Sequence, residues 1–246
     1  ELDSAVLREN GYLAPRAQER QIAEQYRVLK QPILKVAFGE TADRNEFANL
    51  VMVTSALPGD GKTFNCINLA LSIAHERDID ALFVDADVAR PHASELFGVH
   101  NEPGLTDLLK DETTRVADFV LETNVDGLSI LPAGQPDHQS TELLSSKRMK
   151  QVVRELSGSS PNHLIVFDSP PLLVTSESRV LTSYMGQIAM VVCAGKTPQH
   201  AVLDALDNID DSKAINLIFN QATRSVGVSG YADYQYGYGS KAEVQD

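Results

Sequence analysis

The chain has 246 residues, of which 43% are hydrophobic, and its formal net charge is −13. This length suits one large α/β domain or two small ones, with enough chain to bury a sizeable core. Because phosphate-backbone binding needs concentrated lysine and arginine, the acidic balance argues against a nucleic-acid partner. The longest nearly unbroken apolar run, 188–194, is too short to span a membrane, and the first residues lack a signal-peptide pattern. We therefore expect a cytoplasmic protein.

The N-terminal part of the chain is predicted to hold an arm and one interrupted helix. Residues 1–16 mix charges with glycine and proline without a clean period, so we expect a flexible arm there. Apolar residues recur at helical spacing over 16–29. Gln31-Pro32 is expected to break or kink this helix before a second helical piece at 33–38.

A repeated strand-then-helix pattern begins at residue 50. Apolar runs predict strands at 50–54, 81–85, 128–131, 163–167, 188–193 and 214–219. Helices are expected at 63–76, 92–97, 104–109, 141–156 and 198–209. This alternation predicts an α/β fold with a mostly parallel, twisted sheet and helices on both faces. Residues 17–222 are therefore assigned to one domain, and ligands should bind beyond the carboxyl ends of its strands.

A phosphate-binding loop is predicted directly after the first strand. Residues 56–63 read Ala-Leu-Pro-Gly-Asp-Gly-Lys-Thr, which matches the phosphate-loop pattern with Ala56 in place of its first glycine. The glycines let the backbone wrap a phosphate, and the N–H groups that open the next helix point at that anion. Lys62 can reach the β- and γ-phosphates, while the Thr63 hydroxyl can hold Mg²⁺. The expected nucleotide-binding residues are Pro58, Gly59, Asp60, Gly61, Lys62, Thr63 and Phe64.

Acidic residues end two further strands. If the second strand continues far enough, Asp85 and Asp87 project to the same side, where one could orient the Mg²⁺ shell and the other accept a proton. The residues do not decide which acid is the base, and two acids at a strand end could also simply cap a helix. Asp168, followed by Ser-Pro-Pro, is expected to hold a metal-bound water. The catalytic candidates are Lys62, Asp85, Asp87 and Asp168, and the metal candidates are Thr63, Asp85 and Asp168.

The expected nucleotide is ATP. The chain has no Asn-Lys-x-Asp run of the kind that reads guanine. Asn220, at the end of the last strand, could contact adenine through its amide, although an asparagine in an ordinary loop would look the same.

The C-terminal segment, 223–246, is predicted to be a flexible tail that carries phosphoacceptors. Four of the seven tyrosines fall within eight residues, at Tyr231, Tyr234, Tyr236 and Tyr238. Uniform scatter would put about 0.2 tyrosines in such a window. The segment is rich in glycine and lacks residues for a core. Its tyrosines could reach an active site, stack on a partner or the domain, or carry no chemistry.

Together these motifs make the chain resemble the bacterial tyrosine kinases of exopolysaccharide synthesis and export. The resemblance rests on the loop Pro58 to Lys62, on Asp85-x-Asp87, on the apolar run that ends in Asp168 before Pro170-Pro171, and on the tyrosine cluster. The phrase at 85–91, with the Tyr-Gly-Tyr-Gly tail, is most similar to the exosortase-associated branch. The resemblance implies a P-loop fold of the partitioning-ATPase-like type.

The resemblance also implies an activity and partners. We expect Mg-ATP-dependent autophosphorylation of the tail tyrosines, mainly between subunits of a ring-like homo-oligomer, with an octamer among the expected sizes. A membrane-anchored activator, a polysaccharide co-polymerase, would hold the chain at the inner face of the plasma membrane, and a tyrosine phosphatase would reverse the reaction.

Two positions depart from the family pattern. In the family, Glu-x-x-Arg-x-x-Arg on an N-terminal helix forms the ring contacts, and here Glu24, Arg27 and Lys30 occupy these positions, with lysine in place of the last arginine. A solvated charged helix face would look the same. Ala89 stands where many relatives carry arginine, and Arg90 could substitute for it.

Two other functions compete with the kinase. The related partitioning ATPases share the fold, but they carry a signature lysine where this chain has Leu57. The first alternative is an ATP-driven assembly switch of this type, without tyrosine kinase activity. The second is a non-catalytic binding module whose tyrosine tail recruits a partner.

Overall fold

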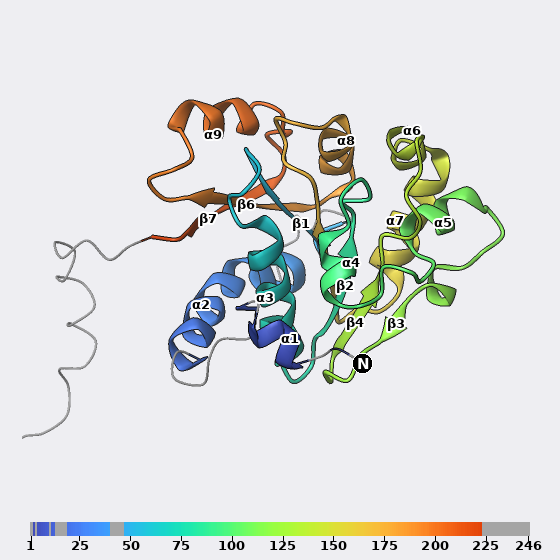
Figure 1. Ribbon diagram of the computed structural model, residues 1–246, viewed down its shortest axis with the longest axis horizontal. Coiled ribbons are helices and arrows are strands. Elements are labelled where there is room, and N and C mark those ends of the chain that lie inside the picture. Colours follow the sequence, from blue (N-terminus) through green and yellow to red (C-terminus); the bar gives the residue numbers. More distant parts are fainter. Residues whose placement is uncertain (1, 3, 10, 13–18, 40–46, 223–246) are drawn as a thin grey trace, which may run out of the picture.

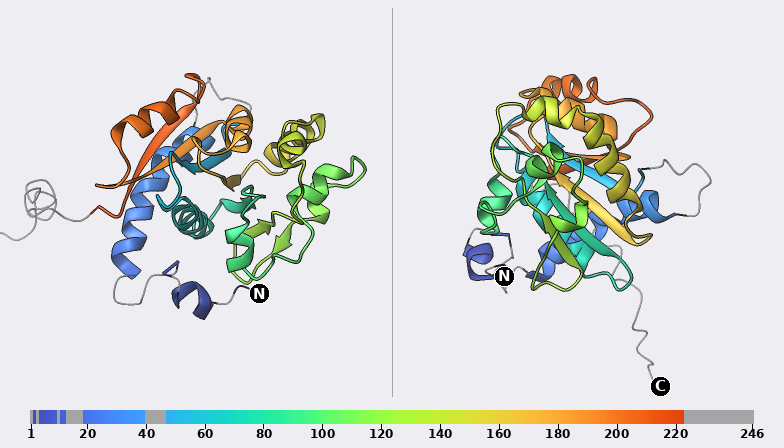
Figure 2. Two further views of the ribbon diagram at one scale, coloured as in Figure 1. Left: turned by 45° about the horizontal axis from the view of Figure 1, so that its top comes forward. Right: turned by 90° about the vertical axis from the view of Figure 1, so that its right-hand side faces the viewer.

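The computed structural model describes residues 2, 4–9, 11–12, 19–39 and 47–222. These residues form a seven-stranded sheet of order β3-β4-β2-β5-β1-β6-β7. Every neighbouring pair is parallel except β3 and β4. Helices cover both faces of this sheet (Figures 1 and 2). The predicted fold class is therefore confirmed.

The strands carry most of the core. Their bounds are β1 (Leu50–Ser55), β2 (Asp80–Asp85), β3 (Leu121–Glu122), β4 (Leu128–Leu131), β5 (His163–Asp168), β6 (Gln187–Cys193) and β7 (Ala214–Asn220). All residues of β1 and β6 are buried, because helices cover both sides of the central strands. Each predicted strand is found within one residue of its expected ends. The two-residue β3 was not predicted, since it is too short to show a period.

Two hydrophobic clusters lie on opposite faces of the sheet. The helices are α1 (Ser4–Glu9), α2 (Glu19–Phe38), α3 (Lys62–Ala74), α4 (His92–Leu96), α5 (Leu105–Lys110), α6 (Ser140–Leu144), α7 (Lys147–Gly158), α8 (Ser176–Tyr184) and α9 (Gln199–Leu206). The first four pack on one face and the last five on the other. No helix in the described ranges is long and apolar enough to cross a bilayer.

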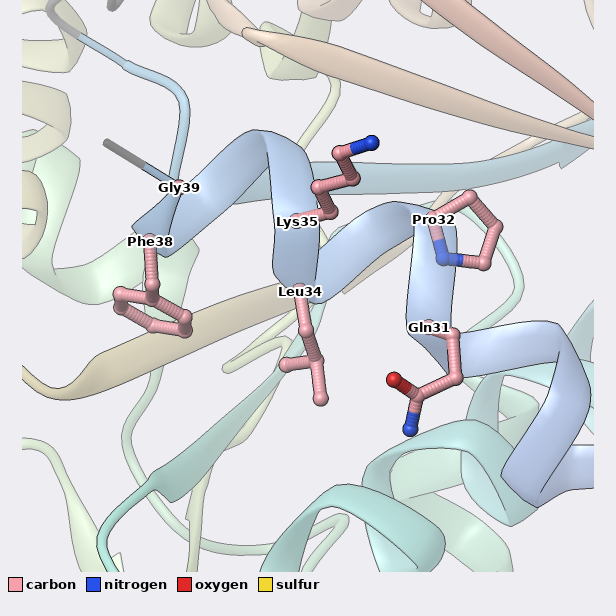
Figure 3. A pocket seen from close by; sticks show the side chains of 6 residues that line it. All are labelled: Gln31, Pro32, Leu34, Lys35, Phe38 and Gly39. Carbon is pink, nitrogen blue, oxygen red and sulfur yellow. The ribbon is translucent and has the colours of Figure 1, made fainter. Parts of the chain in front are cut away.

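The predicted break at Pro32 is wrong, since α2 runs without interruption from Glu19 to Phe38. A proline inside a helix removes one hydrogen bond and crowds the preceding turn. Here Pro32 faces solvent beside a shallow surface pocket (Figure 3), while Ile33 and Ala37 are buried against the core. The Ile33 carbonyl also accepts a hydrogen bond from the buried Gln187 amide at 3.1 Å. Tertiary packing therefore outweighs the lost bond.

The helix predicted at 141–156 is two helices, α6 and α7. The second one begins after Ser146, whose hydroxyl oxygen accepts a hydrogen bond from the Met149 N–H at 3.1 Å. Serine is among the preferred residues at this capping position, so the chain restarts a helix there. Helix α8 was not predicted.

The loose N-terminal arm is also corrected where the structure describes it. Residues 4–9 form α1, and Leu2, Leu7 and Tyr12 are buried against the α2–α3 side of the sheet. The Leu2 N–H donates to Asn124 Oδ1 at 2.9 Å. Three well-spaced apolar side chains thus dock a segment whose local sequence shows no clean period. The predicted domain boundary at residue 16 and the tail at 223–246 lie outside the described residues.

Candidate active site at the carboxyl edge of the sheet

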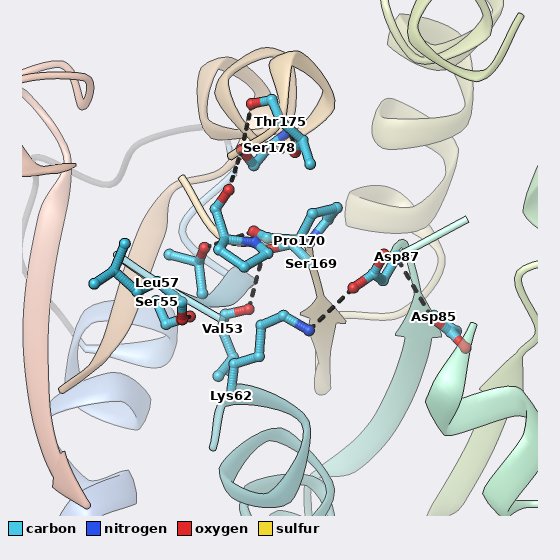
Figure 4. Close-up of polar contacts among 12 residues, drawn as sticks. Val53, Ser55, Leu57, Lys62, Asp85, Asp87, Ser169, Pro170, Thr175 and Ser178 are labelled. Carbon is cyan, nitrogen blue, oxygen red and sulfur yellow. Dashed lines mark hydrogen bonds and ion pairs between the residues drawn. The ribbon is translucent and has the colours of Figure 1, made fainter. Parts of the chain in front are cut away.

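Strand order brings the predicted motifs to one edge of the sheet. Strand β5 lies between β1 and β2, and Asp168 pairs with Val53 on one side and with Asp85 on the other. The loop after β1 and the acidic ends of β2 and β5 therefore meet at one place (Figure 4). Sequence spacing predicted each motif, whereas only the strand order β2-β5-β1 makes them neighbours.

The loop after β1 has the backbone of a phosphate cradle. Gly59 and Gly61 have φ values of 83° and 95°, in the left-handed region that favours glycine. A Cβ atom on Gly61 would lie 2.1 Å from the Asn220 side-chain nitrogen, so a larger residue would have to displace this amide as well as adopt a strained backbone. Helix α3 begins at the next residue without a side-chain cap. Its first N–H groups are thus available to an anion.

Asp60 and Asn220 stabilise this loop. Asp60 is buried, and its carboxylate accepts hydrogen bonds from the Thr197 hydroxyl at 2.7 Å and from the Leu57 N–H at 3.3 Å. Asn220 Nδ2 donates to the Asp60 carbonyl oxygen at 2.8 Å. The Asn220 amide nitrogen, which could also have contacted adenine, therefore holds the loop in this structure. Sequence reasoning missed Thr197, which no motif marks.

Phe64 is oriented toward the N-terminal segment. Its ring centroid lies 5.6 Å from that of Tyr12. Its side chain contributes to the apolar packing beside α3. Only the backbone N–H of Phe64, in the first turn of α3, is therefore placed for the role that we expected in nucleotide binding.

Lys62 projects from the first turn of α3 into the acidic cluster. Its Nζ lies 3.0 Å from Asp87 Oδ2 (Figure 4). Burial lowers the pKa of Lys62, but Asp168 and Asp87 together raise it above its usual value. The side chain is therefore cationic at neutral pH. It pairs with Asp87 in this structure, and a bound phosphate would compete with Asp87 for it.

The two acids after β2 have different surroundings. Strand β2 ends at Asp85, so the condition for both side chains to project alike is not met. Asp85 is 0% exposed, and its Oδ2 accepts hydrogen bonds from the Ser94 N–H at 2.8 Å and the Ser94 hydroxyl at 2.7 Å. Burial raises the pKa of Asp85 to about 6, although these bonds oppose the shift. Asp87 is 7% exposed and pairs with Lys62 instead. Ser94 was also missed by sequence reasoning.

Asp168 has a buried carboxyl group whose two oxygens differ in their hydrogen bonding. Burial raises its pKa to about 7, although the charge of Lys62 and a hydrogen bond from Thr63 oppose this. Its Oδ1 has no hydrogen-bond partner among the described residues. Buried oxygens are almost always satisfied by protein or ordered water. A water of a hydrated Mg²⁺ would satisfy this one, so the donor set fits the expected metal.

The protein donors alone do not form a metal site. No group of three or more histidine, cysteine or acidic side chains suited to a metal ion occurs in the part of the chain that the structure describes. This agrees with the usual binding of Mg²⁺, which keeps several waters and takes ligands from substrate phosphates.

The three residues expected at a subunit contact do not share one exposed face in the structure. Glu24 and Arg27 are exposed on α2 and form an ion pair of 2.8 Å. Lys30 is only 4% exposed, and its Nζ lies 2.7 Å from Glu76 and donates to the Ser72 carbonyl oxygen. Lys30 therefore fastens α2 to the end of α3 rather than sharing the exposed face, and the expected contact reduces to Glu24 and Arg27. The tail tyrosines lie outside the described residues.

Known proteins similar to this chain are tyrosine kinases. The chain is 30% identical over 221 residues to tyrosine-protein kinase YwqD of Bacillus subtilis, which covers 89% of this chain and 87% of that protein. It is 30% identical over 203 residues to tyrosine-protein kinase wzc of Salmonella typhimurium, and covers 27% of that protein's length. No family model matches the chain.

Solved structures agree with the fold. The kinase domain of the Escherichia coli tyrosine kinase ETK superposes with a TM-score of 0.69 at 29% identity, covering 82% of this chain and 78% of that one. The septum site-determining protein MinD of Pyrococcus horikoshii, complexed with Mg-ADP, gives a TM-score of 0.55 at 21% identity, with 72% of each chain covered. The second likeness concerns the fold alone, and it bears out the predicted partitioning-ATPase-like type.

Proposed function

Since the chain belongs to the bacterial tyrosine kinase family, we propose that it is an autokinase that phosphorylates its own C-terminal tyrosine cluster, mainly between subunits. The donor is Mg-ATP, and the acceptors are Tyr231, Tyr234, Tyr236 and Tyr238. The observation that carries the proposal is the meeting of Lys62, Asp87 and Asp168 at a phosphate loop whose left-handed glycines precede an uncapped helix. A binding module would have no need for three buried charged groups at this point.

The loop and Lys62 bind the nucleotide phosphates. The N–H groups of the loop and of the first turn of α3 donate to the β-phosphate. Lys62 leaves Asp87 when the more highly charged γ-phosphate is present, because the phosphate offers several charge-assisted hydrogen bonds in place of one. Nucleotide binding therefore frees the Asp87 carboxylate.

Asp87 is the proposed general base, and Asp85 the positioning acid. The tyrosine phenol oxygen attacks the γ-phosphorus, the bond from that phosphorus to the β,γ-bridging oxygen breaks, ADP leaves, and the phenol proton passes to an Asp87 oxygen. Asp85 is fully buried and bonded twice to Ser94, so no incoming phenol reaches it. Asp85 also accepts the Asp87 N–H at 3.3 Å, which orients the base.

Thr63 and Asp168 are the proposed Mg²⁺-side residues. The Thr63 hydroxyl would ligate the ion, and the unpartnered Asp168 Oδ1 would accept a hydrogen bond from one of its waters. When bound, Mg²⁺ supplies charge that neutralises the transferring phosphoryl group.

The wider setting follows from the family. We infer that the chain regulates exopolysaccharide synthesis or export within the exosortase-associated branch. It would form a ring-like homo-oligomer with Glu24 and Arg27 at the contact, and a membrane-anchored activator would hold it at the inner face of the plasma membrane. A tyrosine phosphatase would reset the tail.

Phosphosite mapping after incubation with Mg-ATP tests the proposal. Intact and peptide mass spectrometry should place every transferred phosphoryl group within 231–238, and Lys62→Met should abolish the signal. If the native chain consumed ATP, with candidate activator segments present, and no tyrosine became phosphorylated, the proposal would be wrong. The assembly-switch function would then take its place.

A further inference from the structure

The outer strand β7 presents an apolar row that the rest of the described chain leaves open. Strand β7 is last in the sheet and pairs with β6 only (Figure 1). On one of its faces, Ile215, Leu217 and Phe219 are 38%, 49% and 67% exposed. We call these three residues the β7 strip. Single exposed apolar residues are common, but three in a row on one strand face form a patch.

Helix α9 packs in the cluster of the neighbouring strand and leaves the β7 strip partly exposed. The register places Ile188, Met190 and Val192 of β6 beside the three strip residues, on the same face. These β6 side chains are buried in the cluster that α9 joins through Ala201 and Ala205. The strip lies one strand further out, at the edge of the described sheet.

Within the described residues, the edge of β7 also lacks the usual protection against strand addition. Natural edge strands carry lysine or proline, contain bulges or are covered, which prevents another strand from pairing. The sequence of β7, Ala-Ile-Asn-Leu-Ile-Phe-Asn, has no charge and no proline. Its pairing with β6 runs in unbroken register over all seven residues. An open edge beside an apolar row is the arrangement that β-strand addition uses.

We propose that residues 231–238 of the same chain pair with the edge of β7 as an antiparallel strand, with Tyr234, Tyr236 and Tyr238 on the β7 strip. These tyrosines are spaced by two, as the strip residues are, so the two rows of side chains can lie side by side on one face of the sheet. The segment has eight residues and β7 has seven. The ten residues at 221–230 are enough to reverse the chain, and the tether raises the local concentration to about the millimolar range.

The charges near this contact predict how phosphorylation would change it. In the antiparallel arrangement the end of the segment lies near the start of β7, where Asp207, Asp210 and Asp211 precede the strand. Lys213 is the nearest cation there, and its Nζ donates to the Ser183 carbonyl oxygen. A tyrosine phosphate carries a charge of about −1.5 to −2 at pH 7. Phosphorylation would therefore release the segment, and this step alone rests on the proposed kinase activity.

Hydrogen exchange of the full, dephosphorylated chain without nucleotide tests the contact independently of catalysis. We expect the amides of 231–238 to exchange at least about tenfold more slowly than an unstructured peptide, at any protein concentration. Leu217→Lys should remove this protection, because it places a charge in the middle of the β7 strip. Val174→Lys adds the same charge at an exposed apolar position outside the strip and should leave the protection intact. Phe219→Ser serves as a second strip variant.

Three results would overturn the proposal. The first is exchange of 231–238 at the unstructured rate in the native chain. The second is protection that survives in both strip variants while the β1 amides show that these variants are folded. The third is protection that appears only as protein concentration rises, because the occupant would then be the tail of a second copy.

Discussion

The centre of the sheet and its β7 edge are opposite in chemistry. At the centre, three buried carboxyl groups surround one partly buried ammonium group, and one carboxyl oxygen has no partner among the described residues. At the edge, large apolar side chains lie in water. Buried charge and exposed apolar surface both cost free energy in the isolated chain. Each region is therefore arranged for something that must bind there: a nucleotide at the centre and a chain segment at the edge.

The two regions also differ in how firmly they are held. Three hydrogen bonds hold the phosphate loop: one within the loop from Leu57, and two from other segments, through Thr197 and Asn220. Among the strands that the structure describes, β7 has a neighbour on one side only. Rigid geometry suits a site where a sub-ångström position decides the rate, whereas an open edge suits reversible contact. The predictions below test this division.

Lys62→Met should have the largest effect. It removes the cation that neutralises the transferring phosphoryl group, so the rate of tail phosphorylation should fall on the order of 10³-fold or more. The measurement is the initial rate of phosphotyrosine formation by quantitative mass spectrometry. Lys150→Met, at an exposed position of α7, is the matched control and should keep the native rate. A Lys62→Met chain with near-native rate would contradict the role given to the centre.

Asp87→Asn and Asp85→Asn should separate the two acids. Loss of the base should lower kcat about 100-fold or more with Asp87→Asn, since proton transfer contributes this order of rate. Asp85→Asn keeps the hydrogen bond from Ser94 possible and should reduce kcat less. Steady-state kinetics over a range of pH gives both values. The assignment fails if the Asp85 variant is the slower of the two.

Asp168→Asn should stabilise the nucleotide-free chain at pH 8. Burial raises the pKa of Asp168 from 3.8 to about 7, so the folded state keeps a proton that the unfolded state has released. Asp168 therefore does not lower the free energy of unfolding below about pH 4, whereas it lowers this free energy progressively as pH rises toward 7. The neutral variant escapes this loss. We expect a gain on the order of 2 kcal/mol, because a tenfold change in proton affinity is worth about 1.4 kcal/mol.

Urea unfolding at pH 5 and pH 8 measures this difference. The gain from Asp168→Asn should be larger at pH 8 than at pH 5. An equal effect at both values would mean that the carboxyl group is not protonated in the folded chain.

Asn220→Ala should have the smallest effect. It removes one hydrogen bond to the phosphate loop, worth about 1 kcal/mol, so the KM for ATP should rise about fivefold with kcat little changed. Asn208→Ala removes a comparable bond to a backbone carbonyl at the end of α9 and should leave KM unchanged. Equal KM values for the two variants would show that the loop does not need Asn220.

Much of the candidate active site at the centre of the sheet could be predicted from the sequence. The glycines, Lys62 and the acids at the strand ends follow from local chemistry, because the binding of phosphates and Mg²⁺ demands those residue types within short motifs at strand ends. The partners of Asp60 and Asp85 could not be predicted. Thr197 and Ser94 become neighbours of these acids only through the strand order, and neither carries a local signal.

Other errors share one cause, the dominance of tertiary packing over local pattern. Pro32 locally favours a break, yet the buried Ile33 and Ala37 keep α2 continuous. Lys30 has the spacing of an exposed charge but is buried against the end of α3. The exposure of the β7 strip depends on its place at the edge of the described sheet, which periodicity does not reveal.

Transfer between two distinguishable chains tests the central claim most directly. One chain keeps its active site but has phenylalanine at the four tail tyrosines, and the other is Lys62→Met with its tail intact. After mixing with Mg-ATP, phosphotyrosine should appear at 231–238 of the Lys62→Met chain, which cannot phosphorylate itself. If the native chain modifies its tail but the mixture yields no phosphotyrosine, the tail is not phosphorylated between subunits, and the account is wrong.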